Sequence, residues 1–191
     1  MTGHTTREGW LTAAVDGVRP WFDEVGVTLP DKIRVACGWS KRAGTAIGWC
    51  WKSEASADGT NELLISPETD EPAKALATLV HELIHASDNG ESKHAGYFRE
   101  TALALGLTGK MTATRAGDAL QARLDKLADS LGPYPHAAIN PLMSATPKQT
   151  TRMIKLTCPD DGYTVRTTKR WIDVGMPSCP CGERMELGDH G

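Results

Sequence analysis

The segment 71–88 constrains the fold more than any other part of this 191-residue chain. Pro72 stands near its start, apolar residues recur at helical spacing, and Asn89-Gly90 follows as a stop signal, so the segment is predicted to be a helix. One face of that helix is apolar and needs a core to pack on. Its members are Leu76, Leu79, Val80, Leu83 and Ile84. His81 and His85 fall on the other side, so the packing face and the histidine face are separate.

Residues 81–85 read HELIH, which is an HExxH motif. Two histidines four residues apart on a helix can direct both imidazoles to one metal ion, with Glu82 beside it. A third histidine, His94, follows at the start of the next predicted helix. A catalytic zinc has three protein ligands and an open fourth position, and His81, His85 and His94 supply that number. We therefore predict one catalytic Zn²⁺, with Glu82 as the general base.

Other ligand sets fit the sequence less well than these three histidines. The metzincin pattern requires glycine and histidine where this sequence has Asp88 and Glu91, so that class is excluded. Glu100, in the following helix, remains an alternative third ligand. Tyr97 and the pair at 41–42, Lys-Arg, are candidates for stabilising the oxyanion, but the sequence does not identify that group and they are not assigned to the site.

The segment HELIHASDNGESKHAGYF resembles the active-site segment of the SprT-like metallopeptidases. The matching positions are His81, Glu82, His85, His94, Ala95 and Phe98, and Ala95 stands where the family often has glycine. The resemblance implies an α+β, zincin-type fold in which a short sheet packs on the HExxH helix. It also implies a zinc-dependent endopeptidase, in which Glu82 assists the attack of zinc-bound water on a peptide bond. Relatives include proteases that act on proteins attached to DNA, so DNA-associated proteins are the expected substrates.

The remaining elements are predicted from periodicity and turn signals. Residues 9–18 form a helix that Pro20 ends or kinks. Three short apolar runs form strands, or a strand plus a hairpin, at 33–39, 46–51 and 61–66. Two further helices are predicted at 95–105 and 114–131. Cys37 and Cys50 lie within the apolar runs and are predicted to be buried thiols.

A Pro-rich segment divides the chain. Residues 132–150, GPYPHAAINPLMSATPKQT, contain little apolar periodicity and are predicted to be a linker. The predicted organisation is a metallopeptidase domain at 1–131, the linker at 132–150, and a small β module at 151–191.

The small module carries three of the five cysteines, Cys158, Cys179 and Cys181. Two cysteine-containing turns on either side of a predicted strand at 163–171 are typical of a zinc ribbon, which holds one structural ion. Asp161 stands where a ribbon usually has its second cysteine. The fourth ligand is therefore Asp161 or His190, or the module holds no metal. A segment this small has little core, so metal would provide most of its stability.

The net charge of −3 conceals an uneven distribution. Residues 54–100 are rich in acids, whereas the stretch 148–170 is basic, with Lys148, Arg152, Lys155, Arg166, Lys169 and Arg170. These bases form either a solvated face or a surface for a DNA backbone, with Trp171 available to stack on a base. The alternative to an enzyme is therefore a non-catalytic zinc protein that binds DNA or has a regulatory role. Glu82, beside an open metal position, favours the enzyme hypothesis.

The same sequence predicts a cytoplasmic protein with a protein substrate and no membrane partner. No run approaches the roughly 20 apolar residues that span a bilayer. The start, MTGHTTREGW, has no apolar signal region. An odd number of cysteines is unsuited to a disulfide framework and favours metal ligation in a reducing compartment.

Overall fold

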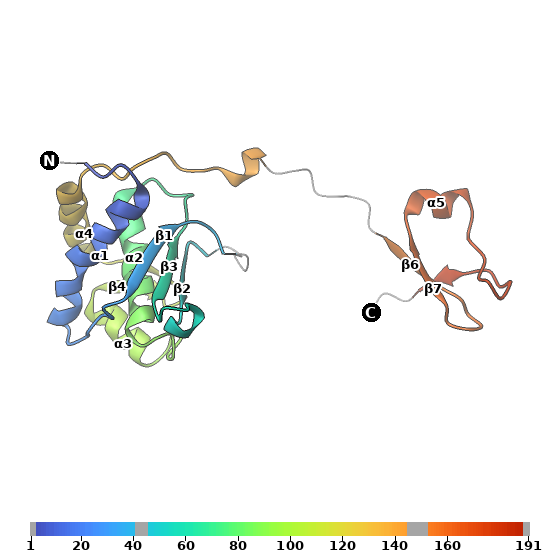
Figure 1. Ribbon diagram of the computed structural model, residues 1–191, viewed down its shortest axis with the longest axis horizontal. Helices are drawn as coiled ribbons and strands as arrows, with labels where there is room; N and C mark the ends of the chain where they lie inside the picture. The colour runs from blue at the N-terminus through green and yellow to red at the C-terminus, as the bar shows by residue number, and fades with distance from the viewer. Residues whose placement is uncertain (1–2, 41–45, 145–152, 189–191) are drawn as a thin grey trace. The chain divides into compact units, whose positions relative to one another are not determined.

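A computed structural model describes residues 3–40, 46–144 and 153–188 and confirms the α+β class (Figure 1). The chain forms two compact units, residues 1–141 and 142–191. The elements of the first are α1 (Arg7–Glu24), β1 (Ile33–Cys37), β2 (Gly48–Trp51), β3 (Asn61–Ile65), α2 (Pro72–Ser87), α3 (Tyr97–Ala104), β4 (Leu107–Lys110), β5 (Ala113–Ala116) and α4 (Asp118–Leu131), with a 3₁₀ turn at Ser53–Ala55. A second 3₁₀ turn, Pro141–Ser144, precedes β6 (Ile154–Thr157), β7 (Thr164–Thr167), α5 (Lys169–Val174) and β8 (Glu186–Leu187) in the second.

The first unit contains a three-stranded sheet in the order β1-β3-β2. The central strand β3 runs parallel to β1 and antiparallel to β2, so all three predicted strands are confirmed with slightly shorter bounds. Along β3 the side chains alternate between buried and half-buried, and Leu63 and Ile65 belong to the buried set. This period of two leaves one face of the sheet for packing.

Helices α1 and α2 pack on that sheet, α1 against β1 and α2 against β2 and β3 (Figure 1). Helix α4 contacts both of them. The predicted apolar face of α2 is fully buried in the resulting core. Its opposite side is therefore held in a fixed orientation by the packing.

Pro20 is predicted to end or kink the first helix; helix α1 continues past it to Glu24, so the first of these alternatives, an end at Pro20, is wrong. Proline has no N–H, so the backbone carbonyl four residues earlier receives no hydrogen bond from it. Pro20 is exposed, and water can donate a hydrogen bond to that carbonyl instead. Beyond it Phe22 is fully buried, and Arg19 donates hydrogen bonds to the carbonyls of Leu29 and Pro30. These contacts hold the last turn of the helix in place.

The helix predicted at 114–131 begins only at Asp118, because residues 113–116 form strand β5. β5 pairs antiparallel with β4, and the hairpin was not predicted. Both strands are short and largely polar, without the apolar alternation that signals a strand. Gly109, within β4, has φ +90°, a conformation that suits glycine. Helix α3 lies within the segment 95–105 predicted for it.

Residues 132–139 belong to the first unit and pack against α1 and Pro67, although the sequence predicts that the linker begins at 132. The buried guanidinium of Arg7 donates from Nε to the carbonyl of Pro135 and from Nη2 to the carbonyl of Ala137, at 2.8 and 3.1 Å. The indole of Trp10 donates to Gly132, and Tyr134 is buried against the Trp10 ring. The later part of the predicted linker, 145–150, lies outside the described residues.

The second unit is a three-stranded sheet in the order β7-β6-β8, with the short helix α5 following β7. The strand predicted at 163–171 is therefore confirmed only at 164–167, and Trp171 lies on α5. Six residues are too few to show helical periodicity in sequence. In the described parts of the chain, no helix combines the length and hydropathy that membrane spanning requires.

Candidate metal centre

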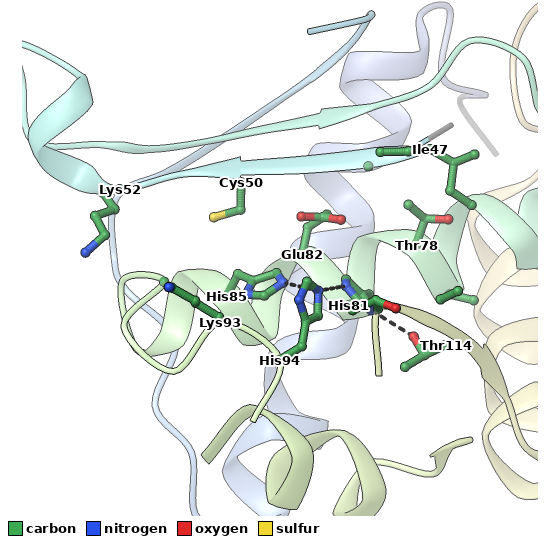
Figure 2. Close-up of a pocket in the computed structure, with 16 residues that line it drawn as sticks. Ile47, Cys50, Lys52, Thr78, His81, Glu82, His85, Lys93, His94 and Thr114 are labelled. Carbon is green, nitrogen blue, oxygen red and sulfur yellow. Dashed lines mark hydrogen bonds between the residues drawn. The ribbon is translucent and has the colours of Figure 1, made fainter. Parts of the chain in front are cut away.

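The histidine face of α2 opens onto a cleft between the helix and strand β2 (Figure 2). Pro72 occupies the first helical position, where its missing N–H costs nothing, and the buried apolar residues anchor the opposite side. His81 and His85 are half-buried and line this cleft. Glu82, between them in sequence, is only 6% exposed.

His94 reaches the same cleft from the turn that follows α2. The carboxylate of Asp88 accepts hydrogen bonds from the backbone N–H groups of Gly90 and Ser92, at 3.0 and 2.8 Å. Asn89 accepts from the backbone N–H of Ser53 at 2.8 Å, which ties the turn to the segment after β2. These bonds fix the turn, so His94 is presented to α2 by a rigid loop.

The three imidazoles meet at their Nε2 atoms. His94 Nε2 lies 3.2 Å from His85 Nε2 and 3.3 Å from His81 Nε2. A tetrahedral zinc ion with Zn–N distances of about 2.0–2.1 Å separates two ligand nitrogens by roughly 3.3–3.4 Å. The predicted histidines therefore come together as a group that could hold a metal ion, with spacing that suits zinc.

The ring of Phe98 supports all three histidines from α3. It is fully buried, stacks on His85 with ring centroids 4.4 Å apart, and meets the His81 and His94 rings at 4.8 and 5.0 Å. A buried aromatic ring in contact with three imidazoles restricts their orientations. It also gives the site an apolar wall on the side of α3.

The electrostatics of the group favour a bound cation. Burial, together with the neighbouring His85 and His94, lowers the pKa of His81 to about 3. Burial also lowers the pKa of His85 to about 4, and it lowers the pKa of His94. At pH 7 the imidazoles are therefore neutral, and their lone pairs are available to a metal.

Glu82 lies beside the three rings and directly below β2 (Figure 2). Burial raises the pKa of its carboxyl group to about 8. The close approach of β2 requires glycine at position 48, because a Cβ there would lie 2.7 Å from Thr78 Cγ2 and would clash with the Glu82 carboxylate. Gly48 is thus part of the site, and no motif in the sequence identifies it.

The cleft has a volume of about 790 Å³. Lys52 and Lys93 lie at one end of it, and Ile47 and Thr78 lie at the other (Figure 2). Strand β2 forms its upper border as an edge strand of the sheet. The cleft is therefore an open groove along a strand edge, with the histidines and Glu82 at its centre.

Two cysteines predicted to be buried are only half-buried. Cys50 faces the cleft from β2, an edge strand, which explains its exposure. Burial, together with the negative charges of Glu82 and Asp88, raises the pKa of the Cys50 thiol to about 12. Cys37 lies at the end of β1, where Arg7 Nη1 approaches its Sγ at 3.6 Å.

Glu100 and Tyr97, which follow the motif in sequence, lie outside the cleft. Glu100, the alternative third ligand, is exposed on α3 and does not belong to the histidine group. Tyr97 does not line the cleft, and its hydroxyl is 3.1 Å from that of Ser87. Lys41 and Arg42 lie outside the described residues.

Sequence reasoning missed Thr114, which lines the cleft from β5. Its Oγ1 lies 2.8 Å from Nδ1 of His81, on the side of the ring away from the other histidines (Figure 2). Thr114 lies in the stretch that the sequence assigned to a helix, so no pattern pointed to this contact.

The second unit brings together its own four candidate ligands, Cys158, Asp161, Cys179 and Cys181, as a group that could hold a metal ion. Cys158 and Cys181 have their sulfur atoms 3.6 Å apart. Both carboxylate oxygens of Asp161 lie near Cys179 Sγ, at 3.4 and 3.5 Å. Asp161 therefore occupies the fourth corner of the group, while His190 lies outside the described residues.

Two tight turns present these ligands. The backbone N–H of Cys158 donates to Tyr163, and that of Cys179 donates to Glu183. Asp161 Oδ1 also accepts from the backbone N–H of Tyr163 at 2.9 Å, which orients the carboxylate. Cys158 and Cys179 are buried, whereas Cys181 is exposed.

Comparison with models of known families, with curated proteins and with solved structures found no match to this chain.

Proposed function

We propose that the first unit is a zinc-dependent endopeptidase of the SprT-like type, with a zincin-type fold. The observation that carries the proposal is the convergence of three neutral imidazoles beside a buried glutamate in an open groove. His81, His85 and His94 would hold the ion, and their mutual spacing suits zinc. Three ligands leave a fourth position for water or substrate.

When bound, zinc lowers the pKa of water and polarises a carbonyl group for attack. The residues of this chain supply the proton transfers. Without metal, burial keeps Glu82 largely protonated at pH 7, whereas a cation on the adjacent histidines would favour its ionised form. The Glu82 carboxylate then accepts a proton from the attacking water as a C–O bond forms at the peptide carbon. Glu82 then delivers that proton to the departing nitrogen as the C–N bond breaks, which returns the enzyme to its starting state.

The open edge of β2 supports a peptide as the substrate. An edge strand offers unpaired backbone groups, to which an extended peptide can add as a further strand. A peptide bound along β2 would pass directly over Glu82, because Gly48 brings this strand against the carboxylate. This arrangement suits cleavage within an extended, unstructured segment of a protein.

The rival proposal, a purely structural zinc in the first unit, has less support. Structural zinc sites are normally closed by four ligands, and the group in the described residues contains three. Burying Glu82 is also costly, since its pKa is raised to about 8. A structural site gains nothing from this cost, whereas a hydrolase needs the carboxylate at that position.

The test compares Glu82→Gln with Glu100→Gln, a matched change at an exposed glutamate outside the cleft. Casein cleavage should fall roughly 10²–10⁴-fold in Glu82→Gln and stay unchanged in Glu100→Gln. Both variants should keep their zinc, measured by elemental analysis, and a chelator should abolish activity in the wild type. Equal activity of Glu82→Gln and wild type, with zinc bound, contradicts the proposal.

We further propose that the second unit holds a structural zinc and contacts DNA, which would direct the protease to DNA-associated proteins. Lys155 and Arg166 stand directly opposite each other on β6 and β7, and both are exposed. Like charges so placed repel each other, and a phosphate between them removes the repulsion. On α5 the guanidinium of Arg170 lies over the exposed Trp171 ring, 5.1 Å from its centroid.

A gel shift with a labelled oligonucleotide tests this contact. Binding should weaken as the salt concentration rises. In the double variant Lys155→Ala, Arg166→Ala, the slope of log affinity against log salt concentration should fall by the equivalent of about two phosphate contacts. Lys126, an exposed lysine on α4 of the first unit, serves as the control position for an alanine change. Absence of binding at low ionic strength contradicts the contact. Two further predicted bases, Lys148 and Arg152, lie outside the described residues.

A further inference from the structure

The contact between His81 and Thr114 differs from the other contacts of the histidine group. It is a short hydrogen bond of 2.8 Å between Nδ1 and a hydroxyl group, on the far side of the imidazole from the metal-facing Nε2. A neutral imidazole carries one proton, on either Nδ1 or Nε2. If Nδ1 holds that proton and donates it to Thr114, then the Nε2 lone pair is free for a metal.

The hairpin that carries Thr114 is fixed to the core at its base. Leu107, at the start of β4, is buried, and the backbone N–H of Gly117 donates to Gly106 at 2.9 Å. Thr114 is half-buried, while its neighbours Ala113 and Arg115 are exposed, so its side chain is the one directed at the protein. The hydroxyl is therefore placed by a rigid element.

We propose that Thr114 is a positioning residue that selects the Nδ1–H tautomer of His81 and fixes the orientation of this ring for the metal. The inference rests on the proposed function, since it assumes a zinc ion on the three histidines. Partners of this kind raise metal affinity because they remove the cost of choosing a tautomer and a ring angle. A hydroxyl adds no negative charge, so the bound metal also keeps its full strength as a Lewis acid.

The test uses Thr114→Val, which keeps the shape of the side chain and removes the hydroxyl, and Thr114→Ser, which keeps the hydroxyl. Thr112→Val is the matched control, because Thr112 lines the same cleft from the same hairpin. Zinc affinity of the full chain is measured by competition with a chromophoric chelator. Cobalt substitution separates the two candidate sites, since only the cysteine-containing site gives thiolate-to-cobalt charge-transfer absorption.

Thr114→Val should weaken zinc binding at the histidines by roughly 10–100-fold and change the visible cobalt spectrum of that site. Thr114→Ser should restore both properties, and Thr112→Val should leave both unchanged. Circular dichroism of the metal-free variants checks that each one folds. If Thr114→Val misfolds, the serine variant still decides, because loss of affinity in a folded Thr114→Ser overturns the inference.

The outcomes for this inference and for the proposed function are distinct. Wild-type zinc affinity and an unchanged cobalt spectrum in Thr114→Val, together with casein cleavage by the wild type, overturn only the role of Thr114. A wild-type protein that binds no metal at the three histidines overturns both.

Discussion

The two units differ in what their candidate metal ligands do for the fold. In the first unit, buried side chains from the sheet and from α1 to α4 form a core, and the histidines lie on its surface. In the described part of the second unit, the core consists of Leu156, Cys158, Cys179 and Met185. Two of those four residues are candidate metal ligands. In the proposed function, the first unit would therefore hold its metal on an independent core, whereas the second unit would depend on its metal for folding.

Removing metal gives the largest expected effect and tests this comparison directly. A strong chelator should unfold the second unit, because it has almost no apolar core, and should leave the first unit folded. In a ¹H–¹⁵N NMR spectrum, dispersed peaks of residues 153–188 should collapse while those of α1 to α4 persist. Collapse of both sets, or of neither, would contradict the proposed difference.

Replacing one cysteine sulfur with oxygen tests whether the second unit depends on a metal for folding. Cys179→Ser removes a buried candidate ligand and should unfold the second unit and reduce the zinc content from two ions to one. Cys50→Ser is the control, because Cys50 lines the cleft and does not belong to the histidine group. It should keep both ions. Elemental analysis and NMR measure the two outcomes, and an unchanged zinc content in Cys179→Ser would remove the second site.

The metal-free first unit should be most stable near pH 6.5. Between pH 4.5 and 6.5, His81 and His85 bind protons only when unfolded, because their folded pKa values are about 3 and 4, so stability rises with pH. Glu82 has the opposite effect on stability. Because its pKa in the folded protein is about 8, its carboxyl group stays protonated over this range, whereas in the unfolded chain it has lost its proton. The free energy of unfolding should therefore rise by about 2–3 kcal/mol between pH 4.5 and 6.5.

Above pH 6.5 the effect of Glu82 outweighs the declining effect of the histidines, so stability should fall as pH rises toward 8. Urea unfolding in the presence of chelator, followed by circular dichroism, measures the profile. Glu82→Gln should remove the decline above pH 6.5. A decline of the same size in Glu82→Gln would show that another group causes it.

The smallest expected effect concerns Gly48. Gly48→Ala adds a Cβ that meets Thr78 and the Glu82 carboxylate, so β2 must move away from α2. Overpacking of this kind costs about 1–3 kcal/mol of unfolding free energy. Gly59→Ala makes a useful control, because no atom lies within 4 Å of its added Cβ although its φ of +70° adds strain. A larger loss of casein cleavage than of stability in Gly48→Ala would show that the strand positions Glu82.

The predictable parts of this molecule are those with long periodic signals. Helix α2, its two faces and the group of His81, His85 and His94 follow from spacing alone. The hairpin β4–β5, and with it Thr114, could not be predicted, because its strands are four residues long and mostly polar. The packing of 132–139 was missed for a related reason, since its anchor, Arg7, belongs to a distant helix.

The Arg7 contacts also determine how the first unit can be re-engineered. One guanidinium joins the start of α1 to the carbonyls of Pro135, His136 and Ala137, and its Nη1 reaches Pro67 at 3.0 Å. The entry and exit of the unit's chain therefore meet at a single point. Folds with adjacent ends tolerate circular permutation. A short peptide joining residue 139 to residue 4 should close this unit into a ring, which could be reopened elsewhere without separating the histidines from Glu82.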